Sequence, residues 1–336
     1  MKYLLIKGAA GLGNRILAAA TGFLYAELAD RRALVDWGDP NYSDDGTDVF
    51  HRYFDSHSVG AMDELPATAS VAPRMWRGRL DRPALELRTE LSGTPAPVAF
   101  RRTCVDLMRS DHPEDVAVMW SNRERIEMLR PLFRGEHAHL ARLPTHAILR
   151  RTIETYMRPR EEISDRVERF RRERLPGRVV GVHARYSDRR TRLDLIRHRL
   201  ERLLAREEDL QVFLATDNVE VRDEFERSYG AVSAPHWYPA PGAASHQGRD
   251  RPDPTEAGAE ALVDLQLLAG CDHLIGDRES SFSRVAMLLS DAPRSHISDV
   301  QALRSRWHLP LKAVWRRVVP GPAAPLAVAA ARRWAP

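Results

Sequence analysis

Residues suited to hold a nucleoside diphosphate follow three predicted strands in the second half of this 336-residue chain. An arginine matches phosphate oxygens through two parallel hydrogen bonds and keeps its charge at physiological pH. A carboxylate can accept hydrogen bonds from ribose hydroxyls or a base edge, and serine hydroxyls with backbone N–H groups at a helix start can cradle a phosphate. The residues, in the order of their strands, are His183 with Arg185, then Asp217, then Ser280, Ser281 and Ser283 with Arg284.

Each of these residues taken alone also has an ordinary structural explanation. A polar residue after a strand is usually a cap or a turn, and Ser280 with Ser281 could simply cap the next helix. The carboxyl ends of parallel strands, however, meet at one edge of a sheet, where ligands of open α/β folds bind. Three polar clusters at one edge therefore favour a ligand site over three unrelated caps.

A glycine-rich turn near the N-terminus is the competing signal. Residues 8–13 (G-A-A-G-L-G) lie between an apolar strand and a helix, and Asp36 ends the next predicted strand. This pattern is close to a dinucleotide fingerprint in which the acid binds a ribose, so a NAD(P)-dependent oxidoreductase is the alternative function. The glycine spacing is irregular for that fingerprint, and the turn continues into Asn14 and Arg15, where an arginine suits a phosphate or a leaving group.

Alternating strands and helices predict the scaffold. They imply βαβ units and parallel sheets, in two blocks. The first block has strands at 3–6, 33–37 and 116–120 and a helix at 16–28; the second has strands at 178–182, 210–215 and 273–275 and helices at 193–204 and 256–269. A charged helical stretch at 145–175 suits a connector. We expect one domain at 1–165, a second at 166–305 and a tail at 306–336.

Two segments have open interpretations. Residues 235–254, rich in Pro, Gly, His and Asp, form a long loop, either an active-site lid or a disordered stretch. The tail at 306–336 carries tryptophans, arginines, alanines and prolines. We expect it to dock on the first domain because its prolines interrupt any amphipathic face, with a weak interfacial membrane anchor as the alternative.

Composition narrows the class of protein. Hydrophobic residues make up 43% and charged residues 29%, as in soluble globular proteins. The net charge of +4 allows an anionic ligand, but no basic stripe interleaved with aromatics points to nucleic acid. No signal peptide or membrane-spanning run is apparent. The chain has two cysteines, Cys104 and Cys271, which lie far apart and fit no zinc spacing. A reducing compartment is the simplest setting for such a chain, so we expect a cytoplasmic protein.

Four short segments resemble, in order, the motifs of one family. Residues 181–188 (G-V-H-A-R-Y-S-D) resemble the H-x-R-R-x-D motif of the fucosyltransferases that include bacterial nodulation and animal core α-1,6-fucosyltransferases and, more distantly, protein O-fucosyltransferases. Residues 213–217 are similar to the second motif, and residues 261–284 to the third. Residues 11–15 (G-L-G-N-R) resemble the N-terminal loop, and 33–37 the strand after it. The resemblance spans about 1–37 and 178–290.

This resemblance implies a GT-B-like α/β fold, with two Rossmann-like domains and a cleft between them. GDP-fucose would lie on the second domain, with a glycan, lipo-oligosaccharide or small-molecule acceptor entering from the first. The resemblance implies that Arg185 binds the diphosphate, that His183 lies near the guanine nucleotide and that Asp217 contacts the guanosine. Ser280, Ser281 and Ser283 would line the phosphate end. Asn14 and Arg15, on the loop that contains Gly11 and Gly13, would face the leaving group.

One departure concerns the donor. The family's second arginine is Tyr186 here, and a lysine that often follows its aspartate is Arg189. Since a tyrosine cannot neutralise phosphate, Arg189 or Arg15 would have to compensate. A transferase for another nucleotide sugar, or a degenerate transferase that only binds, are the alternatives that this substitution raises.

The same residues predict a mechanism. Charge that develops on a GDP leaving group needs fixed positive groups, and Arg185 is the best candidate. The D-x-D pair with which metal-dependent transferases hold an ion occurs nowhere in the chain, so we expect a reaction without a metal. The resemblance implies that the reaction is inverting and uses no cofactor. Asp188 and Asp36 are the candidates for a base, although a surface carboxylate or helix cap explains either one as well.

Overall fold

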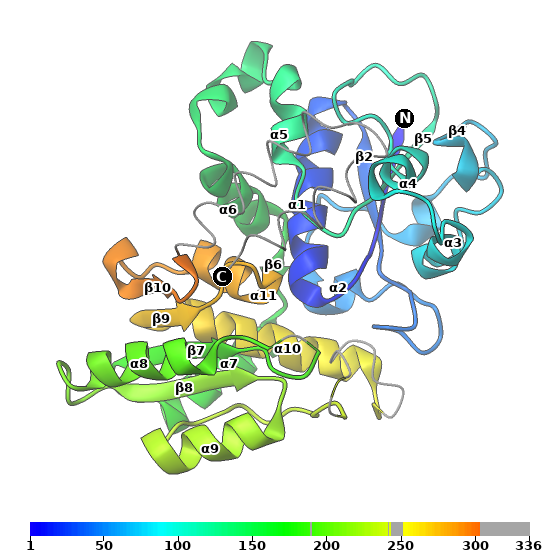
Figure 1. Ribbon diagram of the computed structural model, residues 1–336. Helices are drawn as coiled ribbons and strands as arrows, with labels where there is room; N and C mark the ends of the chain where they lie inside the picture. The colour runs from blue at the N-terminus through cyan, green and yellow to red at the C-terminus, as the bar shows by residue number, and fades with distance from the viewer. Residues whose placement is uncertain (189, 241, 243–250, 303–336) are drawn as a thin grey trace.

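The first sheet is formed by short apolar strands from the first 120 residues (Figure 1). Its order is β2-β1-β5-β4, all parallel. The strands are β1 (Tyr3–Lys7), β2 (Arg32–Asp36), β4 (Val71–Ala72) and β5 (Val116–Trp120). Helix α1 (Leu12–Leu28) follows β1 and is buried along most of its length. Strands covered on both faces are apolar throughout, which is why these runs were visible in the sequence.

The second sheet has the order β10-β9-β7-β8 and is also parallel. Its strands are β7 (Val179–Ala184), β8 (Gln211–Thr216), β9 (His273–Gly276) and β10 (Ile297–Asp299). The helices of this half are α8 (Leu193–Leu204), α9 (Val219–Tyr229), α10 (Pro254–Ala269) and α11 (Ser281–Leu289). This computed structural model describes residues 1–188, 190–240, 242 and 251–302.

Two helices and a short strand connect the halves. They are α6 (Thr145–Tyr156), β6 (Arg158–Pro159) and α7 (Glu161–Arg174), and β6 pairs antiparallel with β3 (Phe54–Asp55). The boundary expected between residues 165 and 166 falls within α7 and stays a prediction. The other helices are α2 (Phe50–Tyr53), α3 (Ala84–Glu90), α4 (Ala96–Thr103) and α5 (Ile126–Leu129), with short 3₁₀ helices at Met62–Glu64, Arg74–Trp76, Arg130–Leu132, Gly135–Arg142 and Arg294–His296.

The two halves pack closely along α1 and α11, which lie side by side (Figure 1). A Cβ on Gly13 would come within 2.6 Å of the Ser281 carbonyl carbon and 2.7 Å of the Phe282 nitrogen. Only glycine therefore allows this approach. The Tyr53 hydroxyl also donates across the interface to the Thr255 carbonyl at 2.9 Å, and one buried apolar core runs through both halves. The cleft between the sheets is thus held in a defined geometry.

The expected architecture is confirmed: the chain is α/β, with two Rossmann-like units. The predicted strands and helices appear within one or two residues of their expected ends at most termini; α1 begins four residues earlier. Strands β4 and β10 were not predicted, because two- and three-residue strands carry no periodic signal. In the part of the chain that the structure describes, no helix is long and apolar enough to cross a membrane. The tail at 306–336, Arg189, and residues 241 and 243–250 of the loop predicted at 235–254 lie outside the described residues.

Candidate active-site cleft

A hollow lies between the two halves, where the carboxyl ends of β1, β7 and β8 converge. We call it the first hollow; it encloses about 890 Å³ of empty space. Its walls come from both halves of the chain. They are Gly11, Leu12, Gly13 and Tyr42 from the first half, and His183, Arg185, Ala215, Thr216, Asp217, His236, Trp237, Arg251, Ala257, Gly258, Glu260, Ala261, Asp264, Ser281 and Phe282 from the second.

His183 lies at the end of β7 as a buried, neutral ring. Its Nδ1 is 2.5 Å from the Ser283 Oγ, and its ring stacks on Phe282 with centroids 5.0 Å apart. Burial, helped by the charge of Arg185, lowers the pKa of His183 to about 3. The ring therefore stays uncharged at neutral pH, and within the described residues its Nε2 makes no hydrogen bond. His183 can offer a ligand one neutral polar atom in a fixed orientation.

Arg185 extends into the first hollow and is held by Asp188. Its Nε and one terminal nitrogen donate to the two carboxylate oxygens at 2.6 and 2.5 Å. Burial acts to lower the pKa of Arg185, but the hydrogen bonds to Asp188 and its charge more than offset this and raise the pKa. About a quarter of the Arg185 side chain remains exposed. The guanidinium is a permanent, oriented cation that faces the cleft.

Asp217 orders the loop that carries Arg185. Its Oδ1 accepts from the backbone N–H groups of Tyr186 and Ser187 at 2.6 and 3.1 Å, and its Oδ2 accepts from the Ser187 hydroxyl at 2.5 Å. The carboxylate also lines the first hollow. These contacts give Asp217 a positioning role in the loop. The ligand contact expected from the sequence stays a prediction.

The three serines near α11 occupy different environments. Ser281 borders the first hollow. Ser283 is fully buried and bonded to His183. Ser280 is the N-cap residue of α11, is 2% exposed, and its hydroxyl has no hydrogen-bond partner among the described residues. Of the three, only Ser281 lines the hollow.

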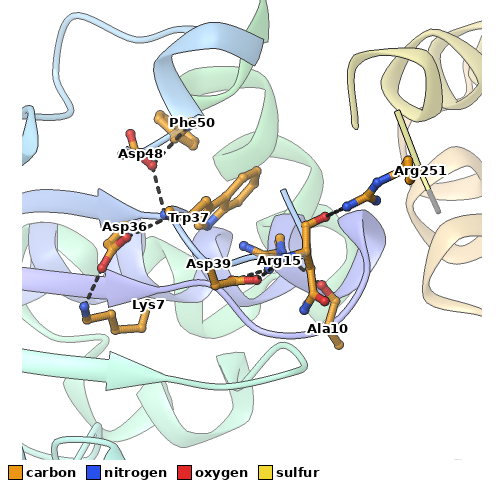
Figure 2. Close-up of polar contacts among 11 residues, drawn as sticks. Lys7, Ala10, Arg15, Asp36, Trp37, Asp39, Asp48, Phe50 and Arg251 are labelled. Carbon is orange, nitrogen blue, oxygen red and sulfur yellow. Dashed lines mark hydrogen bonds and ion pairs between the residues drawn. The ribbon is translucent and has the colours of Figure 1, made fainter. Parts of the chain in front are cut away.

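The structure does not bring Arg15 into the cleft. Its Nε donates to the Ala10 carbonyl at 2.9 Å, and a terminal nitrogen donates to Asp39 at 2.5 Å (Figure 2). Its guanidinium also lies 4.2 Å from the centre of the Tyr42 ring. The residue is 1% exposed and lines neither hollow described here. Arg15 fixes the glycine turn, in which Ala10 has φ of 60°, against the next loop. The expected contact with a leaving group is therefore corrected to a structural role.

Asp36 is likewise committed to the fold. Its Oδ2 accepts from the buried Lys7 ammonium, and its Oδ1 accepts from the Gly38 backbone N–H at 2.9 Å (Figure 2). It lines neither hollow. A carboxylate held in this way cannot serve as the ribose ligand of a dinucleotide or as a catalytic base, so the signal that favoured an oxidoreductase has a structural explanation.

A buried acid on α10 was missed by the sequence analysis. Asp264 is 6% exposed, its Oδ2 lies 3.3 Å from the His236 Nδ1, and its Oδ1 has no hydrogen-bond partner among the described residues. Burial raises the pKa of Asp264 to about 6, against the effect of His236 and with that of Glu260. The signal was present, because Asp264 is the one charge in a run of apolar residues from 261 to 265.

A second hollow continues the cleft on the other side of α11. It encloses about 2650 Å³ of empty space, and Ser281 borders both hollows. Asn14 lines it from the first half of the chain and does not line the first hollow, and its expected contact with the leaving group stays a prediction. Arg284 lines it too and bonds Glu124 across the interface at 2.7 Å. The cleft therefore has two compartments that meet at the N-terminus of α11.

Comparisons with known proteins agree with this architecture. No family model matches the chain. Nodulation protein Z of Azorhizobium caulinodans is 28% identical over 321 residues, covering 83% of this chain and 86% of that protein. The crystal structure of the NodZ α-1,6-fucosyltransferase soaked with GDP-fucose superposes with a TM-score of 0.57, at 22% identity over 86% of this chain and 93% of that one. The chain is a homologue of nodulation protein Z.

Other solved structures share the nodulation-type fold. Fucosyltransferase NodZ from Bradyrhizobium matches with a TM-score of 0.55, 22% identity and coverage of 88% of this chain and 97% of that chain. A point mutant of Arabidopsis thaliana FUT1 in complex with GDP also gives 0.55, at 16% identity over 87% of this chain and 69% of that chain. The same fold therefore accompanies the sequence match, over nearly all of the NodZ chain and about two thirds of the FUT1 chain.

Tyr186, which stands where the nodulation-type motif has its second arginine, lies outside the first hollow. Its ring packs against the apolar core between the second sheet and α8 and α9, and the Arg190 guanidinium lies 5.4 Å from its centre. Tyr186 does not line the first hollow. The residue in the place of the family's second arginine thus serves packing, and in the described part of the chain Arg185 is the motif cation that faces the cleft.

Proposed function

We propose that the protein is a glycosyltransferase that moves fucose from GDP-fucose to an acceptor hydroxyl. The observation that carries the proposal is the meeting of Arg185 and Asp264 in one hollow, within the fold of a homologue whose crystal structure was soaked with GDP-fucose. The two groups are complementary to the two ends of GDP: a fixed cation suits the diphosphate, and a buried carboxylate suits the base.

Asp264 is suited to guanine because of what guanine offers. The Watson–Crick edge of guanine presents two adjacent N–H donors, which match the two oxygens of an ionised carboxylate. Adenine and uracil present acceptors beside a single donor position and leave one oxygen unpaired. Since an unpaired buried polar atom costs about 1–3 kcal/mol, Asp264 with its open Oδ1 should favour GDP over ADP and UDP. His183 supplies a further neutral contact in the same hollow.

Arg185 is placed to bind the diphosphate and stabilise it as it leaves. A guanidinium already oriented by Asp188 needs little reorganisation when charge develops on the phosphate oxygens. We infer that this cation takes the part that a metal ion has in other transferases, so that the reaction is metal-independent. With GDP leaving on the side of the first hollow, an acceptor hydroxyl from the second hollow would attack the opposite face of the anomeric carbon as the bond to the diphosphate breaks, which gives inversion.

Neither acid expected as a base is free to act as one. Asp188 is held by Arg185, and Asp36 is held by Lys7 outside the cleft. An oxocarbenium-like transition state places little demand on a base. We propose a glycan, lipo-oligosaccharide or small-molecule hydroxyl as acceptor, and the cytoplasm as the location, since Cys104 and Cys271 are free and buried.

Turnover of different donors tests the proposal. The wild-type protein should release GDP from GDP-fucose faster than from GDP-mannose, and it should release no UDP from UDP-glucose. Arg185→Ala should lower the rate with GDP-fucose by about 100-fold or more, the usual loss of a positioned transition-state donor. A preference for GDP-mannose would assign another sugar, and turnover that survives Arg185→Ala would remove Arg185 from the mechanism.

A further inference from the structure

The second hollow carries an excess of positive charge. Its lining includes five arginines and three carboxylates. Two of the arginines are neutralised by partners in the wall: Arg284 bonds Glu124 at 2.7 Å, and Arg150 bonds Asp291. These pairs hold the two halves of the chain together and leave little charge for a ligand.

Two further arginines of this wall, Arg278 and Arg294, are different. Arg278 follows β9, and within the described residues its side chain makes no hydrogen bond or ion pair. Arg294 precedes β10 and donates to the His146 Nε2 at 2.8 Å, a neutral partner. Burial, then the charges of Arg294 and Arg278, lower the pKa of His146, so the imidazole is uncharged at neutral pH and both guanidinia act on the same ring.

Arg278 and Arg294 line the same hollow as His146, and the charges of both act on its ring. Like charges that act at one place repel each other. An oxyanion placed between them would remove that repulsion, and a guanidinium matches carboxylate or phosphate oxygens through paired hydrogen bonds. With its solvent-open mouth included, the second hollow spans about 2650 Å³, three times the 890 Å³ of the first. An acceptor of more than one sugar unit would extend through this mouth, with its reactive hydroxyl at Ser281.

We propose that the second hollow binds the acceptor and that Arg278 and Arg294 select an acceptor bearing a phosphate or carboxylate group. This inference rests on the proposed function, because the hollow is an acceptor site only if the first hollow holds the donor. A neutral glycan would leave the two guanidinia unpaired, so it should bind more weakly than its anionic counterpart.

Ligand-observed NMR titrations of the GDP-saturated protein test this, with glucose, glucose 6-phosphate and glucuronic acid as probes. We expect at least one anionic sugar to bind about tenfold or more tightly than glucose, a difference of about 1.4 kcal/mol, and to weaken as salt is added. Preference for glucose 6-phosphate alone would assign a phosphate-bearing acceptor, and preference for glucuronic acid alone a carboxylate-bearing one.

The double variant Arg278→Gln, Arg294→Gln should lose the preference while its GDP affinity stays within about twofold. Arg109→Gln is the matched control, because Arg109 is an exposed arginine of the first half that pairs with Asp111. Equal binding of glucose and both anionic sugars, or a preference that survives in the double variant, would overturn the inference. Failure of GDP itself to bind would instead overturn the proposed function.

Discussion

Replacing Gly13 by alanine should open the cleft by a definable amount. The new Cβ would lie 2.6 Å from the Ser281 carbonyl carbon, whereas ordinary contact begins at 3.4 Å, so α1 and α11 must separate by about 0.8 Å. The obstacle is backbone, which cannot rotate away. Overpacking of this kind typically costs about 1–3 kcal/mol, and a misplacement near 1 Å at a reaction centre can cost about 100-fold in rate.

The assay compares Gly13→Ala with Gly22→Ala on the same helix. A Cβ on Gly22 would meet the Ile6 side chain, at 2.5 Å from Cδ1 and 2.7 Å from Cγ1. Ile6 belongs to β1, so this clash strains the first half of the chain without pushing on α11. Urea unfolding should show a loss of about 1–3 kcal/mol for Gly13→Ala. Its kcat for GDP-fucose turnover should fall by about 10–100-fold, while Gly22→Ala should keep the wild-type kcat.

The outcome that refutes this reasoning is specific. If Gly13→Ala folds and turns over GDP-fucose with wild-type kcat and donor KM, the contact between α1 and α11 does not set the geometry of the site. If both variants lose activity equally, the effect is general destabilisation of α1 and not a displacement at the cleft.

Three further predictions concern the first hollow. Asp264→Asn should weaken GDP binding by about 10–100-fold. The affinity of the wild-type protein for GDP should also fall as the pH drops below about 6, because the pKa of the Asp264 carboxyl group is raised to that value. A GDP affinity that calorimetry finds independent of pH would contradict the role of Asp264. Asp188→Ala should lower kcat by about tenfold, because Arg185 loses its orientation; an unchanged kcat in steady-state assays would count against it. His183 has a pKa of about 3 in the folded protein, against 6.5 for an ordinary histidine, so the unfolded chain binds more protons between these values. The contribution of neutral His183 to the free energy of unfolding is complete above about pH 6.5 and is lost as the pH falls towards 3. In urea unfolding at pH 5 and pH 7, the free energy of unfolding should therefore change less for His183→Gln than for the wild type.

The scaffold could be predicted from the sequence because its strands are buried on both faces. Strands β1, β5 and β7 are apolar runs, and such runs between helical segments indicate parallel sheets. The ends of the strands then place polar residues at one edge by topology alone. His183 and Arg185 were found in this way, and the structure brings both into one hollow.

Contacts between distant segments could not be predicted. Arg15 looked like a ligand residue because its partner Asp39 lies in a later loop, and only the fold shows that their ion pair is buried. Asp264 lies in the middle of a helix, and helical periodicity alone does not show that this face of α10 borders a cleft. The balance of charge in the second hollow depends on which arginines meet carboxylates, and that is a property of the packed halves.

Calorimetric titration with GDP, UDP and NAD tests the central claim most directly. A hollow built on Arg185 and Asp264 should bind GDP with a dissociation constant about tenfold or more below that of UDP, and it should not bind NAD measurably. Titrations in which GDP produces no heat, or in which NAD binds as tightly as GDP, would contradict the assignment of the first hollow to a guanine nucleotide sugar.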